Sequence, residues 1–363
     1  MKIAIVVGVR PEFIKMAPFI KLCQEKKIDH YVIHTGQHYG DEMNKQFFED
    51  FDLDTPNYIL DTHSISTPIQ IAKMITGMED ILSKNKPDIV LVYGDSNSAL
   101  GPALACAKMG ISIGHVEAGL RSFDRTMPEE INRVVVDHMS DFLFAPTEVC
   151  KKNLQNEGIN SNRIFVTGNT VVDSIFYIKN IAKNTSKILD SLKLHSGEFS
   201  ILTLHRPSNV DDEIKLNEIL KSLDLLCNEF STKIIFPIHP RTKKNLETFG
   251  LSIPKNIIAT LPLGYLDFVK LQNNSKVIFT DSGSIQEEAC IIGIPCITIR
   301  DNTERPESVE VQANILTKSD FQSIKQAFKT QIQISTDWKN PYGDGTASQQ
   351  ILDICLKYQN LKH

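Results

Sequence analysis

Short runs rich in valine and isoleucine alternate with amphipathic helical stretches along the whole chain. Continuously apolar strands that alternate with helices are typical of parallel sheets covered by helices on both faces. The runs form two series, which predicts two doubly wound α/β domains. The predicted strands are 3–7, 30–34, 89–92, 112–116, 142–145 and 163–166 in the first series, and 200–204, 233–237, 257–260, 276–280 and 295–299 in the second.

The helical periodicity and the length of the chain predict its division into domains. Helices are expected over 11–25, 69–83, 100–108, 216–230 and 348–358. At 363 residues the chain is long for one core and sufficient for two. We expect an N-terminal domain at 1–172, a C-terminal domain at 173–345, and a C-terminal helix at 346–363 that can pack back on the N-terminal domain.

Composition narrows the class of protein. The net charge of −5 gives no general attraction to nucleic acid or to anionic membranes. The seven cysteines are scattered and mostly lie in apolar runs, which favours reduced core thiols over a disulfide framework. No apolar run approaches the length of a membrane span, and Met1 leads directly into a strand without a signal peptide. We therefore expect a cytoplasmic protein.

Polar segments directly follow eight of the predicted strands, four in each half. They are 8–12, 34–38, 94–97, 117–121, 205–209, 239–241, 281–284 and 300–305. In open α/β sheets, ligands bind beyond the carboxyl ends of the strands. Polar strand ends in both halves predict a cleft between two facing domains.

Residues 280–288, Thr-Asp-Ser-Gly-Ser-Ile-Gln-Glu-Glu, join a predicted strand, a turn of small residues and a helix start. A helix N-terminus offers N–H groups and the positive end of its dipole to an anion. Glu288, one turn into this helix, is suited to accept hydrogen bonds from sugar hydroxyls, so the segment suits a nucleotide. The alternative is that Asp281 or Ser282 simply caps the helix.

Four carboxylates, Asp95, Glu117 and the adjacent Glu129 and Glu130, stand at or near strand ends in the first half. Carboxylates in a partly desolvated site have raised proton affinity, which suits general acid and base catalysis. Glu129 has a simpler explanation, because residues 128–130 are a plain helix first turn and Arg133 can pair with Glu129 on the helix surface. Asp95 and Glu117 each follow a buried strand close to a glycine, which favours the catalytic interpretation.

Basic and histidine side chains at strand ends suit an anionic ligand. Arg10 and Lys15 flank a helix start and suit a phosphate, with ordinary surface charge as the alternative. The segment after the first strand, Gly8-Val-Arg10, contains a single glycine. The glycine-rich dinucleotide fingerprint is therefore missing, and NAD is not expected. His205 ends the first strand of the second half and is either a structural histidine or a phosphate ligand or acid.

A metal site is not predicted. His115 and Glu117 are two residues apart and could share one face of a strand end as metal ligands. No third ligand stands at a recognisable spacing, and neither a P-loop nor a Gly-x-Ser-x-Gly elbow occurs. We therefore expect no metal and no cofactor.

The chain resembles the non-hydrolysing UDP-N-acetylglucosamine 2-epimerases of bacteria and archaea over nearly its whole length. The motifs that carry the resemblance are Gly8-Val-Arg-Pro-Glu12, His34-Thr-Gly-Gln-His-Tyr39, Val92-Tyr-Gly-Asp-Ser96, His115-Val-Glu-Ala-Gly-Leu-Arg-Ser122, Pro128-Glu-Glu-Ile-Asn-Arg133, Thr203-Leu-His-Arg206, Thr280-Asp-Ser-Gly283 and Thr303-Glu-Arg-Pro-Glu307. The resemblance implies two Rossmann-like domains in the GT-B arrangement, a UDP-sugar bound between them, and a homodimer.

The resemblance also implies roles for residues at the family's functional positions. The implied catalytic residues are Asp95, Glu117, Glu129 and His205. The implied substrate-binding residues are Arg10, Lys15, Arg133, His205, Phe268 at the uracil, Ser282, Gly283 and Ser284 at the diphosphate, Glu288 at the ribose, and Arg305. In some bacterial members a second UDP-N-acetylglucosamine acts as an activator, and its implied ligands here are Gln37, Gln70, Arg206 and His239.

Two departures from the family pattern bear on these sites. The usual Ser-Gly-Gly is Ser282-Gly283-Ser284 here, and Ser284 is expected to strain the phosphate turn if a glycine conformation is needed. The usual His-Arg-Arg-Glu-Asn is His205-Arg-Pro-Ser-Asn209, in which Pro207 stiffens the loop. The second departure affects the activator site more than the UDP site.

The implied reaction is the reversible C2 epimerisation of UDP-N-acetylglucosamine to UDP-N-acetylmannosamine. UDP is eliminated to give a 2-acetamidoglucal and then adds back, and the product supplies surface polysaccharide. Alternatives are a 2-epimerase of UDP-2,3-diacetamido-glucuronate or of a deoxy sugar, a hydrolysing epimerase, a GT-B glycosyltransferase and a nucleotide-sugar sensor without turnover.

Overall fold

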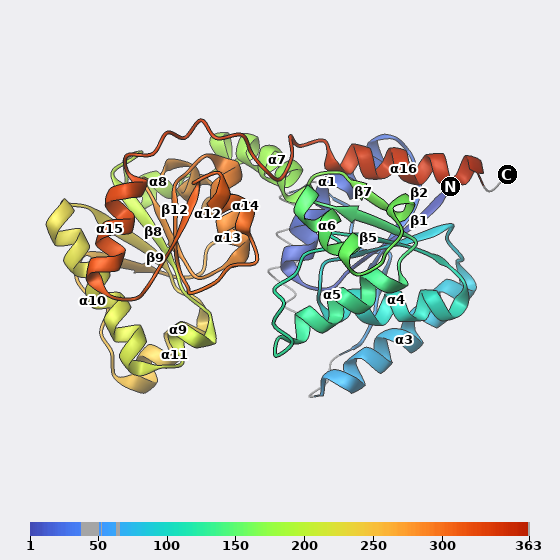
Figure 1. The fold of residues 1–363 in the computed structure, drawn as a ribbon, viewed down its shortest axis with the longest axis horizontal. Coiled ribbons are helices and arrows are strands. Elements are labelled where there is room, and N and C mark those ends of the chain that lie inside the picture. The colour runs from blue at the N-terminus through green and yellow to red at the C-terminus, as the bar shows by residue number, and fades with distance from the viewer. Residues whose placement is uncertain (38–50, 52, 63–65, 362–363) are drawn as a thin grey trace. The chain divides into compact units, whose positions relative to one another are not determined.

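The computed structural model describes residues 1–37, 51, 53–62 and 66–361. It contains two compact units, each built around its own parallel sheet (Figure 1). Unit 1 comprises residues 1–176 and 342–363, and unit 2 comprises residues 177–341. The chain passes from unit 1 to unit 2 within helix α7 (Thr170–Thr185).

The sheet of unit 1 has seven parallel strands among the described residues, in the order β3-β2-β1-β4-β5-β6-β7. They are β1 (Lys2–Val7), β2 (Asp29–His34), β3 (Tyr58–Ile59), β4 (Ile89–Tyr93), β5 (Ser112–Val116), β6 (Phe142–Ala145) and β7 (Ile164–Val166). Strands β4 and β6 are buried at every position, and β1 at every position but its first. Burial of both faces explains why these segments are continuously apolar.

The helices of unit 1 include one that returns from the C-terminal end of the chain. They are α1 (Arg10–Glu25), α3 (Thr67–Lys84), α4 (Asn97–Met109), α5 (Pro128–Met139), α6 (Glu148–Asn156), the 3-10 helix η1 (Ser161–Arg163), the first part of α7, and α16 (Ala347–Leu361). Helix α16 lies beside α1 (Figure 1), where Cys23 and Cys355 are buried. Hydrogen bonds from Asn169 N to Tyr342 O (2.8 Å) and from Ser348 N to Asp173 Oδ1 (2.9 Å) fix this returning segment.

The sheet of unit 2 has six parallel strands in the part of the chain that is described, in the order β10-β9-β8-β11-β12-β13. They are β8 (Phe199–Thr203), β9 (Lys233–Pro237), β10 (Ile257–Thr260), β11 (Ile278–Thr280), β12 (Cys296–Ile299) and β13 (Asn314–Thr317). The sheet is enclosed by α8 (Ile188–Ser191), α9 (Pro207–Val210), α10 (Glu213–Phe230), α11 (Pro240–Phe249), α12 (Tyr265–Asn274), α13 (Gly283–Ile292), α14 (Pro306–Glu310) and α15 (Phe321–Gln331).

Apolar side chains from these helices build two separate cores in unit 2. Helices α10, α11 and α15 pack on one, and α8, α12 and α13 on the other. Burial on both faces is the condition under which an all-parallel sheet is stable. Within the described ranges, no helix combines the length and the apolar character needed to cross a membrane.

Every predicted strand is present, with ends within two residues of those expected. The pattern missed β3 and β13. Strand β3 has only two residues, and β13 is an edge strand whose central positions are half-buried. Neither segment is a continuous apolar run, because each lies at the edge of its sheet, where burial is incomplete.

Both sheets reverse the direction of their strand order once, between β1 and β4 in unit 1 and between β8 and β11 in unit 2. Ligands of open α/β sheets bind beyond the carboxyl ends of the strands at such a switch point. The residues that follow these four strands are Gly8, Gly94, Leu204 and Asp281. Asp95 and His205, which directly follow Gly94 and Leu204, therefore lie at the positions that the topology favours.

Candidate functional site

In unit 1, Glu12 connects the loop after β1 to the loop after β4. It lies buried in the first turn of α1 and accepts hydrogen bonds from Gly8 N (2.7 Å) and Val9 N (3.2 Å). Its other oxygen accepts a hydrogen bond from Ser96 Oγ. Burial raises the pKa of the Glu12 carboxyl to about 7. Glu12 is not among the predicted site residues, although a glutamate three residues into a helix after a glycine turn is a recognisable signal.

Lys15, one turn further along α1, meets Glu117 at the end of β5. The Lys15 Nζ lies 2.7 Å from Glu117 Oε1, and both side chains are buried. Asn169 Nδ2 donates to the same oxygen at 3.0 Å, and the Lys15 ammonium lies 5.4 Å from the ring centre of Tyr93. Glu117 has a φ of +71°, which costs a non-glycine residue about 1 kcal/mol or more. The predicted carboxylate is thus held by the buried Lys15 and by Asn169, and these contacts help to maintain the strained backbone of Glu117. Arg10, at the start of the same helix, is half-buried.

Arg133 of α5 holds Asp95, which follows β4. Its guanidinium donates to Asp95 Oδ2 and to Glu130 Oε2. Asn132 Nδ2 donates to the Asp95 backbone carbonyl at 2.9 Å. The Asp95 side chain remains 36% exposed, so this carboxylate is both anchored and accessible. The interpretation of Arg133 as a surface partner of Glu129 is wrong, because Arg133 is buried and pairs with Glu130 and Asp95.

Two neighbouring acids of α5 occupy different environments. Glu129 is exposed in the first turn and makes no side-chain hydrogen bond to a described residue, whereas Glu130 is buried. The Glu130 carboxylate accepts hydrogen bonds from Ser122 N and Phe123 N, each at 2.9 Å, and these bonds help to hold its pKa below the usual range. The structure therefore groups Asp95 with Arg133 and Glu117 with Lys15, and it leaves Glu129 outside both pairs.

The two predicted activator residues of unit 1 lie against the start of α4. Gln37 Oε1 accepts hydrogen bonds from Ser98 N (3.0 Å) and Ser98 Oγ (2.7 Å), and Gln70 Oε1 accepts one from Asn97 Nδ2 (2.9 Å). Both side chains thus line the turn that follows Asp95. The motif that contains Gln37 continues into residues 38 and 39, which lie outside the described residues.

His115 lies at the end of β5, two residues before Glu117, and is fully buried. Its Nδ1 lies 2.6 Å from Asp137 Oδ1 and its Nε2 lies 2.8 Å from Gly94 O, so both ring nitrogens are engaged in hydrogen bonds. Among the residues that the structure describes, no three His, Cys, Asp or Glu groups are arranged to hold a metal ion.

In unit 2, Asp281 connects the loop after β11 to the loop after β8. The residue is fully buried and accepts hydrogen bonds from His205 N (3.1 Å), Arg206 N (3.0 Å) and Asn209 Nδ2 (3.3 Å). Ser282 is the N-cap of α13, but its side chain makes no capping hydrogen bond. The alternative of simple helix capping by Asp281 or Ser282 is therefore wrong.

The first residue of α13, Gly283, lies directly against the carboxylate of Glu304. A Cβ at this position would collide with Glu304 Oε1, so a larger residue here requires the Glu304 carboxylate to shift. Arg206 Nη2 lies 2.9 Å and Arg300 Nη1 2.8 Å from the Glu304 carboxylate. The charges of Arg305, Arg300 and Arg206 lower the pKa of Glu304 to about 2, against the opposing effect of burial. Sequence reasoning named Arg206 and Arg305 but not Glu304, which pairs with Arg206 and Arg300, although Glu304 lies in the Thr303–Glu307 motif.

The two departures from the family pattern both fall in the first turn of a helix. Ser284 is the second residue of α13 and does not have a positive φ, so the left-handed backbone that would strain a serine is not adopted at this position. Pro207 is the first residue of α9, where its missing N–H costs nothing. It therefore starts a helical turn while Asn209 remains bonded to Ile299 O at 2.9 Å.

The remaining predicted residues of unit 2 gather around α12, α13 and α14. Glu288 is buried in α13 and accepts a hydrogen bond from Gln272 Nε2 at 2.7 Å. Phe268 is half-buried in the first turn of α12 and packs on the core shared with α13. Arg305, buried at the start of α14, has its Nε 3.4 Å from Glu287 Oε2.

The two predicted histidines of unit 2 are neighbours. The rings of His205 and His239 have centres 5.4 Å apart, and burial lowers the pKa of both. His205 Nε2 lies 4.0 Å from Asp281 Oδ1. His239 caps α11, since its ring accepts a hydrogen bond from Arg241 N at 3.2 Å.

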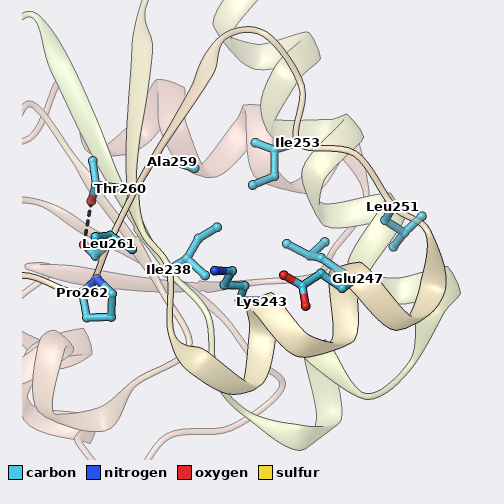
Figure 2. Close-up of a pocket in the computed structure, with 10 residues that line it drawn as sticks. Ile238, Lys243, Glu247, Leu251, Ile253, Ala259, Thr260, Leu261 and Pro262 are labelled. Atoms are coloured by element: carbon cyan, nitrogen blue, oxygen red, sulfur yellow. Dashed lines mark hydrogen bonds between the residues drawn. The ribbon is translucent and has the colours of Figure 1, made fainter.

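A cavity of about 510 Å³ lies beside α11 (Figure 2). Apolar side chains such as Ile238, Leu246 and Ile253 line it, together with Lys243 and Glu247. None of the predicted site residues lines this cavity. One lining residue, Ile238, directly precedes the predicted activator ligand His239 in the sequence. Neither it nor any other lining residue is part of the predicted site.

Known proteins similar to this chain point to one family. The family model described as UDP-N-acetylglucosamine 2-epimerase matches residues 20–356. The chain is 46% identical to a UDP-N-acetylglucosamine 2-epimerase of Methanocaldococcus jannaschii, over 98% of each protein. A crystal structure of the M. jannaschii UDP-GlcNAc 2-epimerase in complex with UDP-GlcNAc and UDP matches with a TM-score of 0.90, covering 99% of this chain and 100% of the other. A UDP-2,3-diacetamido-2,3-dideoxy-D-glucuronate 2-epimerase of Pseudomonas aeruginosa is 38% identical, over 98% of this chain and all of the relative.

Two Rossmann-like parallel α/β units place the protein in the class of GT-B-like folds, and this part of the predicted fold class is confirmed. Within that class, the chain belongs to the UDP-N-acetylglucosamine 2-epimerase family. Its activity is that of an epimerase, which makes it an isomerase.

Proposed function

We propose that this enzyme interconverts UDP-N-acetylglucosamine and UDP-N-acetylmannosamine without hydrolysing either. The observation that carries the proposal is a pair of carboxylates at the ends of neighbouring strands. Asp95 follows β4 and Glu117 follows β5, and each is bound by a buried cation, Arg133 or Lys15. Two carboxylates fixed near one another suit a reaction that removes a proton from one face of a carbon and returns it to the other.

The chemistry explains why more than one group is needed. The C2 proton of an N-acetylglucosamine unit is not acidic, so direct removal and return of this proton is disfavoured. In the proposed route, a base takes the C2 proton while the C1–O bond breaks, which gives UDP and a 2-acetamidoglucal. UDP oxygen then attacks C1 as an acid delivers a proton to the opposite face of C2. Atoms balance, and no metal or cofactor is consumed.

We assign the nucleotide to the residues of unit 2. The start of α13, Ser282 to Ser284, offers backbone N–H groups and a helix dipole to the diphosphate, with His205 and Arg305 nearby. Glu288 suits the ribose hydroxyls and Phe268 the uracil. Cations held close to the leaving diphosphate stabilise the charge that develops as the C1–O bond breaks.

The sugar is assigned to unit 1, where Asp95, Glu117 and Glu129 supply acid and base and Arg10, Lys15 and Arg133 supply positive charge. A second UDP-N-acetylglucosamine is proposed as an activator, with Gln37, Gln70, Arg206 and His239 as ligands. We also propose a cytoplasmic homodimer that supplies N-acetylmannosamine units for surface polysaccharide.

The proposal is tested by an NMR time course in D2O with UDP-N-acetylglucosamine alone. Deuterium is expected at C2 of both sugars, and UDP-N-acetylmannosamine is expected to accumulate. Retention of hydrogen at C2 during turnover contradicts the mechanism. Accumulation of free N-acetylmannosamine and UDP indicates a hydrolysing enzyme. Turnover of UDP-N-acetylglucosamine alone excludes a glycosyltransferase, which needs an acceptor, and a sensor, which binds without turnover.

A second substrate is supported by the relative from P. aeruginosa, which is named as a 2-epimerase of UDP-2,3-diacetamido-2,3-dideoxy-D-glucuronate. The same NMR experiment with that nucleotide sugar compares the two candidates directly. We expect kcat/KM to be higher for UDP-N-acetylglucosamine, and the reverse order would replace the proposed substrate. The Asp95→Asn variant is expected to retain UDP binding and to lose turnover.

A further inference from the structure

Asp137 of α5 is fully buried and binds three groups of β5 and the turn that follows it. Its Oδ1 lies 2.6 Å from His115 Nδ1. Its Oδ2 accepts a hydrogen bond from Gly119 N at 3.2 Å and lies 2.7 Å from Arg121 Nη1. One carboxylate therefore joins α5 to the whole segment that contains Glu117.

His115 extends this connection to the neighbouring strand. Its Nε2 lies 2.8 Å from Gly94 O, at the residue directly before Asp95. Asp137 and His115 together thus reach the backbone next to both carboxylates of the proposed site. A one-residue change at Asp137 is expected to affect two loops at once, because His115 lies between them.

The turn after β5 needs such support. Glu117 has a φ of +71° and Gly119 a φ of +83°, so two of three consecutive residues have left-handed backbone. A Cβ on Gly119 would meet the carbonyl group of Cys150, which shows how closely the turn approaches α6. Strained backbone of this kind persists only where surrounding contacts determine it.

Arg121 fixes the other end of the turn. Its Nε and Nη2 bind the two carboxylate oxygens of Glu157 at 2.6 and 2.7 Å, and its Nη1 donates to Leu120 O at 2.7 Å. Bidentate contacts of this geometry are stronger and more directional than single hydrogen bonds. Asp137 is therefore held from two sides, by His115 and by Arg121.

We propose that Asp137 is a positioning residue for epimerisation, which with His115 and Arg121 holds Asp95 and Glu117 in their reactive geometry. This inference rests on the proposed function. Displacement of a catalytic group by about 1 Å can reduce a rate by about 100-fold without loss of binding. The network contacts the backbone of the turns, so its effect is expected on kcat and not on substrate affinity.

The test compares Asp137→Asn with Asp141→Asn in the full-length protein. Asp141 is the control: it is an exposed aspartate whose Oδ2 also accepts a hydrogen bond from β5, from Ile113 N (2.9 Å) near the other end of the strand. For Asp137→Asn we expect kcat to fall about 10- to 100-fold with KM changed less than about threefold. For Asp141→Asn we expect kcat and KM to stay within about twofold of wild type.

An unchanged kcat in folded Asp137→Asn overturns the proposal, and so does an equal loss in Asp141→Asn. If Asp137→Asn does not fold, His115→Gln serves in its place, since it breaks the link to Gly94 but leaves Asp137 bound to Arg121. An unchanged kcat in His115→Gln then overturns the proposal. Failure of the wild type to epimerise UDP-N-acetylglucosamine refutes the proposed function instead, and the comparison is then made with whichever UDP-sugar the wild type epimerises.

Discussion

Lys15 Nζ lies 2.7 Å from Glu117 Oε1, in a buried ion pair that joins α1 to the end of β5. Removal of one member of such a pair leaves an uncompensated buried charge, which costs about 3 kcal/mol or more. We expect Lys15→Met to lower the free energy of unfolding by about 3 kcal/mol. The double variant Lys15→Met/Glu117→Gln is expected to recover part of this loss, because the remaining side chain is neutral. Urea unfolding of the two single variants and the double variant measures the coupling, and additive effects would show that the pair contributes nothing.

Glu12 is expected to make stability depend on pH. Its pKa is raised from 4.5 to about 7 by burial, so the unfolded chain loses this proton at lower pH than the folded protein does. The stabilising contribution of the protonated carboxyl is complete below pH 4.5 and is lost as the pH rises through about 7. We expect the difference in unfolding free energy between Glu12→Gln and wild type to change by about 3 kcal/mol over this range, in favour of the variant at high pH.

The control for this prediction is Glu25→Gln, which changes an exposed glutamate at the other end of α1. Urea unfolding between pH 4 and pH 8.5 gives the two difference curves. If the difference in unfolding free energy from wild type changes with pH equally for both variants, Glu12 does not titrate with the raised pKa.

Glu304 is expected to show the opposite dependence on pH. The neighbouring arginines lower its pKa from 4.5 to about 2, so its ionised form stabilises the folded protein above pH 4.5. This contribution is lost as the pH falls through about 2. We expect Glu304→Gln to lower the unfolding free energy by about 3 kcal/mol at pH 7, and the deficit to shrink in acid. Glu310→Gln, an exposed change in α14, is the control, and a deficit at pH 7 no larger than that of the control contradicts the prediction.

Substitutions at the neighbouring residues Glu129 and Glu130 are expected to have different effects, the first on activity and the second on stability. Glu129 is exposed and Glu130 anchors the backbone of Ser122 and Phe123. We expect Glu129→Gln to reduce turnover with unfolding free energy within about 0.5 kcal/mol of wild type. We expect Glu130→Gln to lose about 2 kcal/mol of stability, because it weakens a charged acceptor of several hydrogen bonds. Paired unfolding and NMR turnover measurements decide, and normal turnover in Glu129→Gln would remove this residue from the proposed catalytic set.

The fold could be predicted from the sequence because its strands are buried on both faces and therefore read as continuous apolar runs. The positions of Asp95, Glu117, His205 and Asp281 followed from the same pattern, since each is a polar residue just beyond the carboxyl end of a buried strand. The strands that escaped prediction, β3 and β13, are edge strands without a continuous apolar run. Their periodicity was therefore too weak to detect.

The partners of the site residues could not be predicted, because they come from distant parts of the chain. Lys15 and Glu117 are 102 residues apart, and Arg206 and Glu304 are 98 apart. Local reasoning instead favoured a neighbour, Glu129, as the partner of Arg133. Glu12 and Asp137 were overlooked for a related reason. A glutamate in a first helical turn and an aspartate in a helix are ordinary on local grounds, and only burial distinguishes them.

Unit 1 is assembled from both ends of the described chain. Helix α16 packs on α1, and its residue Ser348 donates a backbone hydrogen bond to Asp173. During synthesis on the ribosome, the sheet of unit 1 and helix α1 emerge first. The side of α1 that contacts α16 is covered only after α16 has been synthesised. Unit 2 is continuous in sequence and can complete its core in the meantime. The order of translation is therefore expected to differ from the order of folding, and the side of α1 that α16 covers stays exposed until α16 has been made.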